Sequence, residues 1–415
     1  MDLMTTIAFI LIVVLLLLGV EILVVLGIGT ILLTLLTGAF SLENIGFTVF
    51  NSINNFALIA MPLFILTGDL ISDSGISRRL VDFSRSMIGW LRGGLAMTGI
   101  VASAFFAAIS GSNSATTAAM GRIMVPEMEK DGYPTAYSAA NAASGGIVGV
   151  IIPPSIVFVI YGAISGVSVG DLFLGGILPG LILVLLMMAT AFVLRSRNNW
   201  GERRRFSLKE LFKNLWRANL AFLATAIILV GIYGGIFTPS EAGAVAAVYC
   251  LVVGLLVTRS IKITEVPSIM NKSATINGMI APIIALAIVF SQILGFLGLP
   301  SAAVNGLLGL STNSVVLTLL VLFVLLLAGA VMETTPNVVL LVPILAPFAT
   351  QVLGFDPIHF GVVMVVTLAL GFITPPLGLN LFVASSITGA SVLDIAYRSL
   401  PYLLALAIGV LIVTF

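Results

Sequence analysis

Long runs of apolar residues dominate the hydrophobic pattern of this chain. Three of them span 7–18, 172–194 and 315–327, and none alternates with a period of two. Half-buried strands alternate with that period, whereas apolar helices do not. A membrane-spanning chain must also satisfy its backbone hydrogen bonds internally, which leaves helices or closed barrels. The pattern therefore predicts an all-helical protein that crosses a membrane several times.

The composition supports lipid as the main solvent. Of 415 residues, 60% are hydrophobic and 8% are charged, whereas a soluble domain carries about 25% charged residues. So few charged side chains are not enough to cover the surface of a water-soluble protein. The N-terminus has Asp2, no early Lys or Arg and an apolar stretch longer than that of a signal peptide, so Met1 is expected to begin the mature chain.

Few residues are available for thiol or imidazole chemistry. One cysteine, Cys250, and one histidine, His359, exclude a disulfide framework and a Cys/His metal cluster. The net charge of +1, without a basic stripe, gives no indication of nucleic-acid binding. The functional chemistry must therefore reside in other polar residues.

The 18 Lys and Arg residues predict a topology. Cytoplasmic loops concentrate these residues, and the densest cluster lies at 195–217. With that segment as a basic cytoplasmic loop, counting helices in both directions places all 18 cations on the same face. Arg92 and Lys130 then both lie inside, so the segment between them enters and leaves the membrane from the cytoplasm. Both termini are expected on the periplasmic side.

The sequence repeats itself at an interval of about 222 residues. The pairs that match at this interval are Pro153-Pro154 with Pro375-Pro376, Gly132 with Gly354, and Pro179 with Pro401. In the predicted topology the first half's hairpin enters from inside and the second half's from outside, so the repeat is inverted. Inverted repeats with interrupted helices are typical of secondary transporters.

The expected organisation is two halves around the basic loop. The first inverted repeat covers 1–194 and comprises scaffold helices at 1–72, a surface arm helix at 73–92, a hairpin at 93–130 and a broken helix at 133–164. The second covers 218–415, with a hairpin at 313–352 and a broken helix at 357–390. Segment 73–92 mixes charged residues and a tryptophan with apolar ones, as a helix lying along the membrane surface does, and a similar helix is expected at 209–215.

Two short polar segments interrupt the hairpins at corresponding positions. Ser110–Ser114 lies in the first hairpin and Met332–Pro336 in the second. Each lies between apolar segments of about 15 residues, shorter than the ~20 residues of a full span. Two half-length helices that meet at a polar tip form a re-entrant hairpin, and each hairpin is followed by a helix that breaks at glycine and at a Pro-Pro pair.

The tips and breaks offer ligands for a cation and an anion together. Carbonyl groups freed at a helix break, like Ser, Thr and Asn oxygens, suit a hard cation such as Na⁺. The helix N-termini at Ser114 and after Pro336 direct partial positive charge at an anion. Isolated Ser and Thr residues more often bond to nearby carbonyls or join helices, but paired tips beside Pro-Pro breaks favour a functional role.

Three further polar residues at membrane depth have two interpretations each. A carboxylate at the bilayer centre, such as Glu333, costs at least ~2.5 kcal/mol, so it faces a cavity, a cation or a proton unless it snorkels outward. Asn141 and Asn380 lie near the two breaks and either reach the same cavity or hydrogen-bond between helices. The candidate substrate-binding residues are Ser114, Thr116, Asn141, Thr335 and Asn380.

These motifs resemble the large membrane subunit of the tripartite ATP-independent periplasmic (TRAP) transporters, of the DctM/SiaM type. The resemblance rests on SGSNSATTAAMGRIMVPEMEKDGYP and GGIVGVIIPPS in the first half and on METTPN and GFITPPLGLNLFV in the second. It extends through nearly the whole chain. It implies an elevator-type secondary transporter of the bacterial inner membrane, driven by a Na⁺ gradient, that takes up organic acids. Overall similarity places the chain in the sialic-acid branch, with C4-dicarboxylates as the next expected substrates.

The resemblance also implies partners and Na⁺ ligands. A periplasmic substrate-binding protein delivers the substrate, and a small four-helix membrane subunit, expected as a separate chain, accompanies the large one. The first implied Na⁺ site comprises Ser110, Ser112, Asn113, Gly145, Val148 and Pro153. The second comprises Glu333, Thr334, Gly371, Thr374 and Pro375. The second tip lacks an Asn at the position that matches Asn113, so its ligand set is less completely defined.

Three alternatives remain open at this point. A stand-alone Na⁺/anion symporter of the divalent-anion type has similar hairpin tips, whereas a passive channel would not need two broken-helix repeats. An intramembrane serine hydrolase would use Ser110, Ser112 or Ser114, but the one possible base, His359, lies near an outer loop, and such chemistry needs hydrogen-bond contact. We therefore expect a transporter and not an enzyme.

Overall fold

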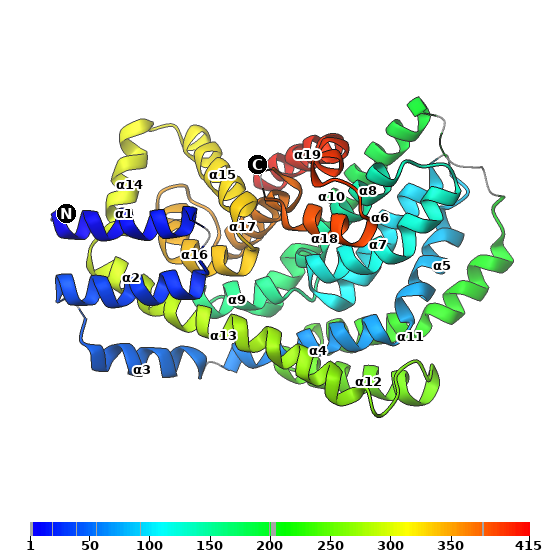
Figure 1. The fold of residues 1–415 in the computed structure, drawn as a ribbon, viewed down its shortest axis with the longest axis horizontal. Helices are drawn as coiled ribbons and strands as arrows, with labels where there is room; N and C mark the ends of the chain where they lie inside the picture. The colour runs from blue at the N-terminus through cyan, green and yellow to red at the C-terminus, as the bar shows by residue number, and fades with distance from the viewer. Residues whose placement is uncertain are drawn as a thin grey trace.

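Helices form all of the secondary structure in the part of the chain that the structure describes (Figure 1). This computed structural model describes residues 3–18, 20–38, 40–54, 56–91, 93–198, 200, 205–375 and 377–415. Arg92, Arg203, Arg204 and Pro376, which entered the predicted topology and repeat, lie outside the described residues, as does Met1.

Six helices among the described residues are long and apolar enough to cross a membrane. They are Val169–Ser196, Leu208–Tyr233, Pro239–Val257, Val266–Phe296, Ser314–Val331 and Val392–Thr414. Several shorter apolar helices accompany them, including Gly94–Ser110 and Pro357–Ile373. The predicted fold class, an all-helical polytopic membrane protein, is confirmed.

One group of helices, here called the scaffold layer, lies along the left and lower sides of Figure 1. Its central member is α13, which packs against α2, α3 and α4, while α12 packs against α4 and α11. Its members are α1 (Leu3–Leu17), α2 (Ile22–Thr37), α3 (Leu42–Ile53), η1 (Phe56–Ile59), α4 (Ala60–Asp73), α11 (Leu208–Tyr233), α12 (Pro239–Val252), η3 (Val253–Val257) and α13 (Val266–Phe296).

A second group, here called the hairpin layer, contains the segments for which the sequence predicts two hairpins and two broken helices. From the first half it takes α6 (Gly94–Ser110), α7 (Asn113–Lys130), α8 (Thr135–Gly146), η2 (Ile147–Val150), α9 (Ile156–Ser165) and α10 (Val169–Asn198). From the second half it takes α15 (Ser314–Val331), α16 (Thr334–Gln351), α17 (Pro357–Leu370), η4 (Gly371–Ile373), α18 (Leu379–Thr388) and α19 (Val392–Thr414). The same succession of elements thus occurs twice.

The two halves of the chain interleave inside the hairpin layer. Helix α18 packs against α7 and α8, and α19 packs against α8 and α10. The largest fully buried side chains concentrate here, and two of them, Tyr137 and Tyr402, join the halves by a hydrogen bond of 2.9 Å between their hydroxyls. This shared core holds both hairpins in one body.

Helix α5 (Ile76–Ile88) connects the two layers. It packs against α6 and α11, and Phe83, Phe105 and Phe222 from these three helices form an aromatic cluster with centroids 5.2–5.6 Å apart. On its polar side, Arg78 and Arg85 donate to the Glu127 carboxylate of α7 at 2.6 and 2.8 Å. The helix predicted as the surface arm is therefore amphipathic. Its apolar face packs against the protein, and its cations lie on the other face. Helix α14 (Leu299–Leu310) packs against α13 and α16.

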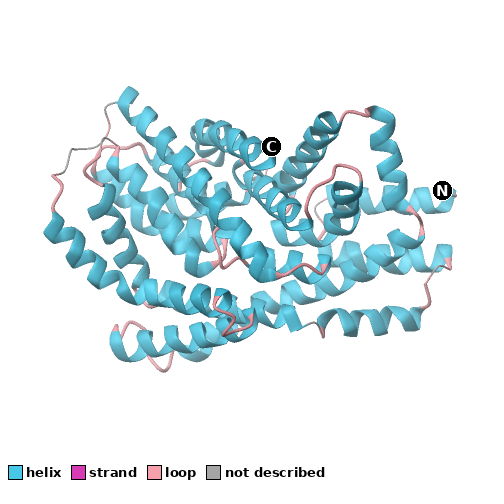
Figure 2. Cartoon of the chain, turned by 180° about the vertical axis from the view of Figure 1, so that it is seen from behind, coloured by secondary structure: helices cyan, strands magenta, loops and turns pink. Residues whose placement is uncertain are grey.

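Most of the described part of the basic segment 195–217 is helical (Figure 2), including 209–215, where the sequence predicted a helix. Helix α10 continues to Asn198, and α11 begins at Leu208, where the Ser207 hydroxyl accepts from the Glu210 N–H at 3.3 Å. Helix-favouring Lys, Leu and Glu residues behind a serine cap explain this start. Lys209, Lys213 and Arg217 accordingly lie on a helix.

Candidate functional site

The first hairpin turns at Gly111, between α6 and α7. Gly111 has a φ of +61°, in the left-handed region that favours glycine. Ser112 then caps α7, because its hydroxyl accepts from the Ala115 N–H at 3.4 Å and its carbonyl accepts from the Thr116 hydroxyl at 2.7 Å. The polar residues of this tip thus satisfy backbone groups that a helix start leaves free.

The first tip rests directly on the interrupted helix of the same half. A Cβ at Gly149 would overlap the Ser112 backbone, and a Cβ at Gly111 would lie 2.7 Å from the Pro154 carbonyl oxygen. Such close approach of one backbone to another requires glycine. Carbonyl oxygens of the break are consequently brought beside the polar tip.

The second hairpin forms a matching contact in its own half. A Cβ at Gly371, where α17 passes into η4, would overlap the backbone of Gly329 and Ala330 at the end of α15. Gly371 lies 222 residues after Gly149, so the two breaks use glycine at matching positions for the same purpose.

The second tip is closed by Asn337, which the sequence analysis did not identify. Its amide Nδ2 donates to the carbonyls of Ala328 and Met332, each at 3.0 Å. Asn337 is fully buried, and neither its Oδ1 nor the buried Thr334 hydroxyl has a hydrogen-bond partner. The residue lies in the METTPN motif, two positions beyond Thr335, which matches Asn113 at the 222-residue interval. An alignment of the two halves that allowed a shift of two residues would have found it.

Both tips line one cavity of about 350 Å³. Its opposite wall comes from α4 and α13 of the scaffold layer. The predicted residues at its surface are Ser110, Ser112, Asn113, Ser114, Glu333, Thr334 and Thr335. Glu333 is exposed and precedes the first residue of α16. Hydroxyl, amide and carboxylate oxygens therefore meet beside the N-termini of α7 and α16, an arrangement that suits a hard cation next to an anion.

Two charged residues of the scaffold layer complete the cavity wall. The Asp69 carboxylate of α4 accepts from Lys272 Nζ at 2.5 Å and from the Ser273 hydroxyl of α13 at 2.7 Å. Lys272 entered the sequence analysis only as one of the 18 cations placed on the cytoplasmic face. Because 203 residues separate the partners, no local pattern in the sequence indicates this pair.

The other predicted site residues lie behind the tips. Asn380 connects the halves, because its Oδ1 accepts from Asn113 Nδ2 at 3.2 Å and its own Nδ2 donates to the Ala143 carbonyl at 3.0 Å. Asn141 donates to the Ala96 carbonyl and to the Tyr402 hydroxyl, inside the hairpin layer. The predicted residues that do not line the cavity are Thr116, Asn141, Gly145, Val148, Pro153, Gly371, Thr374, Pro375 and Asn380.

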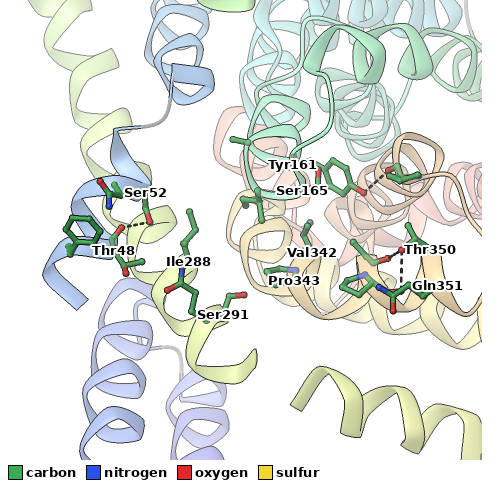
Figure 3. Close-up of a pocket in the computed structure, with 18 residues that line it drawn as sticks. Thr48, Ser52, Tyr161, Ser165, Ile288, Ser291, Val342, Pro343, Thr350 and Gln351 are labelled. Atoms are coloured by element: carbon green, nitrogen blue, oxygen red, sulfur yellow. Dashed lines mark hydrogen bonds between the residues drawn. The ribbon is translucent and has the colours of Figure 1, made fainter. Parts of the chain in front are cut away.

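A second, larger cavity of about 750 Å³ lies at the other ends of α13 and α16 (Figure 3). Residues of α3 and α13 face residues of α9 and α16 across it (Figure 3). Its polar lining side chains are uncharged and comprise Thr48, Asn51, Ser52, Tyr161, Ser165, Ser291, Gln292, Thr350 and Gln351. Between the two cavities, α13 and α16 pack together.

His359 and the serines of the first tip have different hydrogen-bond partners. Its Nε2 donates to the Val413 carbonyl at 2.7 Å. The Ser110 hydroxyl instead pairs with Thr116 and that of Ser112 with Ser114. No observation favours the hydrolase alternative.

The family comparison covers nearly the whole chain. Residues 9–415 match the model of the "Tripartite ATP-independent periplasmic transporter, DctM component". The fold is also similar to the solved structure of the Alcanivorax borkumensis YdaH transporter, with a TM-score of 0.64 over 91% of this chain and 89% of that one. At 16% sequence identity, this second likeness shows the fold alone.

Three curated relatives illustrate the range of the family. The chain is 39% identical to the C4-dicarboxylate TRAP transporter large permease protein DctM of Pseudomonas aeruginosa, over 94% of this chain and 91% of that protein. It is 34% identical to the sialic acid TRAP transporter large permease protein SiaM of Vibrio cholerae, over 86% and 83%. It is 39% identical to the isethionate TRAP transporter permease protein DctMQ of Oleidesulfovibrio alaskensis, of whose length it spans 62%.

Proposed function

The chain belongs to the DctM component family of the tripartite ATP-independent periplasmic transporters, and from this premise we propose that it performs Na⁺-coupled uptake of an organic acid. The observation that carries the proposal is the meeting of both polar tips in one cavity. Six membrane-length helices in the described part of the chain, together with the relatives, support a multi-pass protein of the bacterial inner membrane.

The proposed substrate is an anion. Relatives of this chain are named for C4-dicarboxylate, sialic acid, 2,3-diketo-L-gulonate and isethionate, all of which are anionic at neutral pH. Sialic acid is the first expectation from the sequence and a C4-dicarboxylate the second. The N-termini of α7 and α16 at the cavity support binding of either.

The proposed Na⁺ sites lie where each tip meets its break. The first uses Ser110, Ser112 and Asn113 with carbonyls of the first break, and the second uses Glu333 and Thr334 with carbonyls of the second. Support comes from the glycine contacts that bring each break to its tip. Further support comes from two buried oxygens of the second tip, Thr334 Oγ1 and Asn337 Oδ1, that accept no hydrogen bond, since a bound cation would satisfy them.

The proposed mechanism is an elevator in which the hairpin layer moves along the scaffold layer. Helices α13 and α16 line one cavity at one pair of ends and the second cavity at the other. Sliding the tips from one cavity toward the other would expose the same ligands to opposite sides. In the proposed orientation, with both termini periplasmic, the cavity with Lys272 opens to the cytoplasm.

Two further subunits belong to the proposal: a small four-helix membrane protein and a periplasmic substrate-binding protein. They distinguish it from a stand-alone Na⁺/anion symporter. Proteoliposomes containing the large subunit with or without its small partner should take up labelled sialic acid or succinate only when both the small subunit and the loaded binding protein are present. Equal uptake by the large subunit alone would establish the stand-alone alternative.

A further inference from the structure

The cavity between the tips and the scaffold layer has one cationic side chain among the described residues that line it. This is Lys272, in the second turn of α13. The other charged lining residues, Asp69 and Glu333, are acidic. An anionic substrate in this cavity therefore meets two carboxylates and a single ammonium group.

Lys272 retains capacity for another partner. Its ammonium group has three N–H donors, and one is used on Asp69. The side chain is 58% exposed, against 13% for Asp69. Asp69 has a second donor in the Ser273 hydroxyl, so its carboxylate remains hydrogen-bonded if Lys272 shifts toward a ligand.

We propose that Lys272 binds the acidic group of the substrate, a carboxylate or sulfonate, while the tips face this cavity. The proposal rests on the proposed function, which makes the substrate an anion. A Na⁺ ion beside Glu333 would neutralise that carboxylate without leaving net positive charge, and the α7 and α16 N-termini contribute only partial charges. Lys272 is the full positive charge that the described lining of the cavity itself offers the substrate.

The position of Lys272 makes this contact specific to one state of the transporter. It belongs to the scaffold layer, whereas the tips belong to the hairpin layer. Gln292, which lines the second cavity, lies 20 residues further along α13, or about 30 Å at 1.5 Å per residue. A substrate held by tips that face the second cavity would therefore be out of reach of Lys272. The polar side chains that line that cavity are uncharged, so none of them replaces the Lys272 contact.

Equilibrium binding to the purified complex of large and small subunits tests this directly. The probes are labelled sialic acid and succinate in saturating NaCl. For the probe that the wild type binds, Lys272→Gln should raise Kd about tenfold or more, the loss typical of a hydrogen bond to a charged group. Lys272→Arg should stay within about threefold, because it retains the charge. The neutral methyl ester or diamide of the probe should bind wild type and Lys272→Gln equally.

Asp69→Asn separates substrate binding from a structural role of the ion pair. It releases Lys272 from its partner while keeping an acceptor for Ser273, so it should leave Kd unchanged or lower. If Asp69→Asn and Lys272→Gln raise Kd and lower Tm alike, the pair is structural and the inference is wrong. Equal Kd for wild type and Lys272→Gln also overturns it, while leaving the proposed function intact. If the wild type binds neither acid, the proposed function fails as well.

Discussion

At the scale of single residues, Asn113 is the point where the first tip meets the second half of the chain. Its amide donates to Asn380, which in turn donates to the Ala143 carbonyl beside the first break. A chain of amides therefore joins a tip, the opposite half and a broken helix. Its loss would disturb both a proposed Na⁺ ligand and the register of the halves.

We predict that Asn113→Ala lowers Na⁺-dependent uptake to less than about a tenth of wild type. The substitution removes a proposed Na⁺ ligand and leaves the buried Asn380 amide without its hydrogen-bond donor. Initial uptake rates in proteoliposomes measure this, and size-exclusion chromatography checks assembly with the small subunit. Asn305→Ala, at an exposed position on α14, is the matched control. Wild-type Na⁺ dependence in Asn113→Ala would refute the assignment.

The sequence predicted which residues form the two tips but not how all of them are used. Ser, Asn and Glu stand out in an apolar hairpin, so Ser110, Asn113 and Glu333 were identifiable. Asn141 and Asn380 had two interpretations, because an amide at membrane depth serves equally well in a cavity or between helices. The structure shows such interhelical bonds for both. Lys272 resembled any other cytoplasmic lysine until the fold placed it against Asp69.

At the scale of elements, glycine makes the contact between each hairpin and its broken helix. The hydrophobic pattern and the half-length segments predicted the hairpins, and glycine with Pro-Pro predicted the breaks. The contacts of Gly149 and Gly371 with their own hairpins belong to the tertiary structure, because they depend on how each broken helix packs against its hairpin. The helix near 209–215 inside the basic segment was predicted, but its continuity with the membrane-length part of α11 was not.

We predict that Gly371→Ala destabilises the protein and abolishes transport, because the added methyl group would overlap the backbone of Gly329 and Ala330. Backbone cannot yield as a flexible side chain can, so a loss of about 3 kcal/mol is expected, at the upper end of the range typical of overpacked cores. Thermal unfolding of the purified complex measures the effect. Gly278→Ala, on α13 with nothing within 4 Å of the new Cβ, should be neutral. Equal Tm values for both variants would contradict the packing account.

At the scale of the whole molecule, two cavities lie at opposite ends of the contact between the scaffold and hairpin layers. Both are lined by α13 and α16, so one sliding interface would serve both sides of the membrane. The 222-residue interval and the distribution of cations predicted an inverted repeat, and the elevator mechanism was implied by the family resemblance. The cavities themselves depend on the spacing between layers, which no sequence pattern specifies.

We predict that thiols placed in the two cavities react from opposite sides of the membrane. In a Cys250→Ala background, which removes the single native cysteine, Ser114→Cys should react with an impermeant maleimide in inside-out vesicles. Ser291→Cys should react in right-side-out vesicles, because Ser291 lines the second cavity. Preferential labelling of both from the same side would contradict the proposed orientation and two-sided access.

The central claim is that a Na⁺ gradient drives uptake of an organic acid through the site at the two tips. The most direct test is uptake of labelled sialic acid or succinate into proteoliposomes containing both membrane subunits, with loaded binding protein outside. We predict accumulation above equilibrium with an inward Na⁺ gradient, and none when K⁺ replaces Na⁺ or when the gradient is collapsed. Accumulation that is unaffected by removal of the Na⁺ gradient would contradict the account.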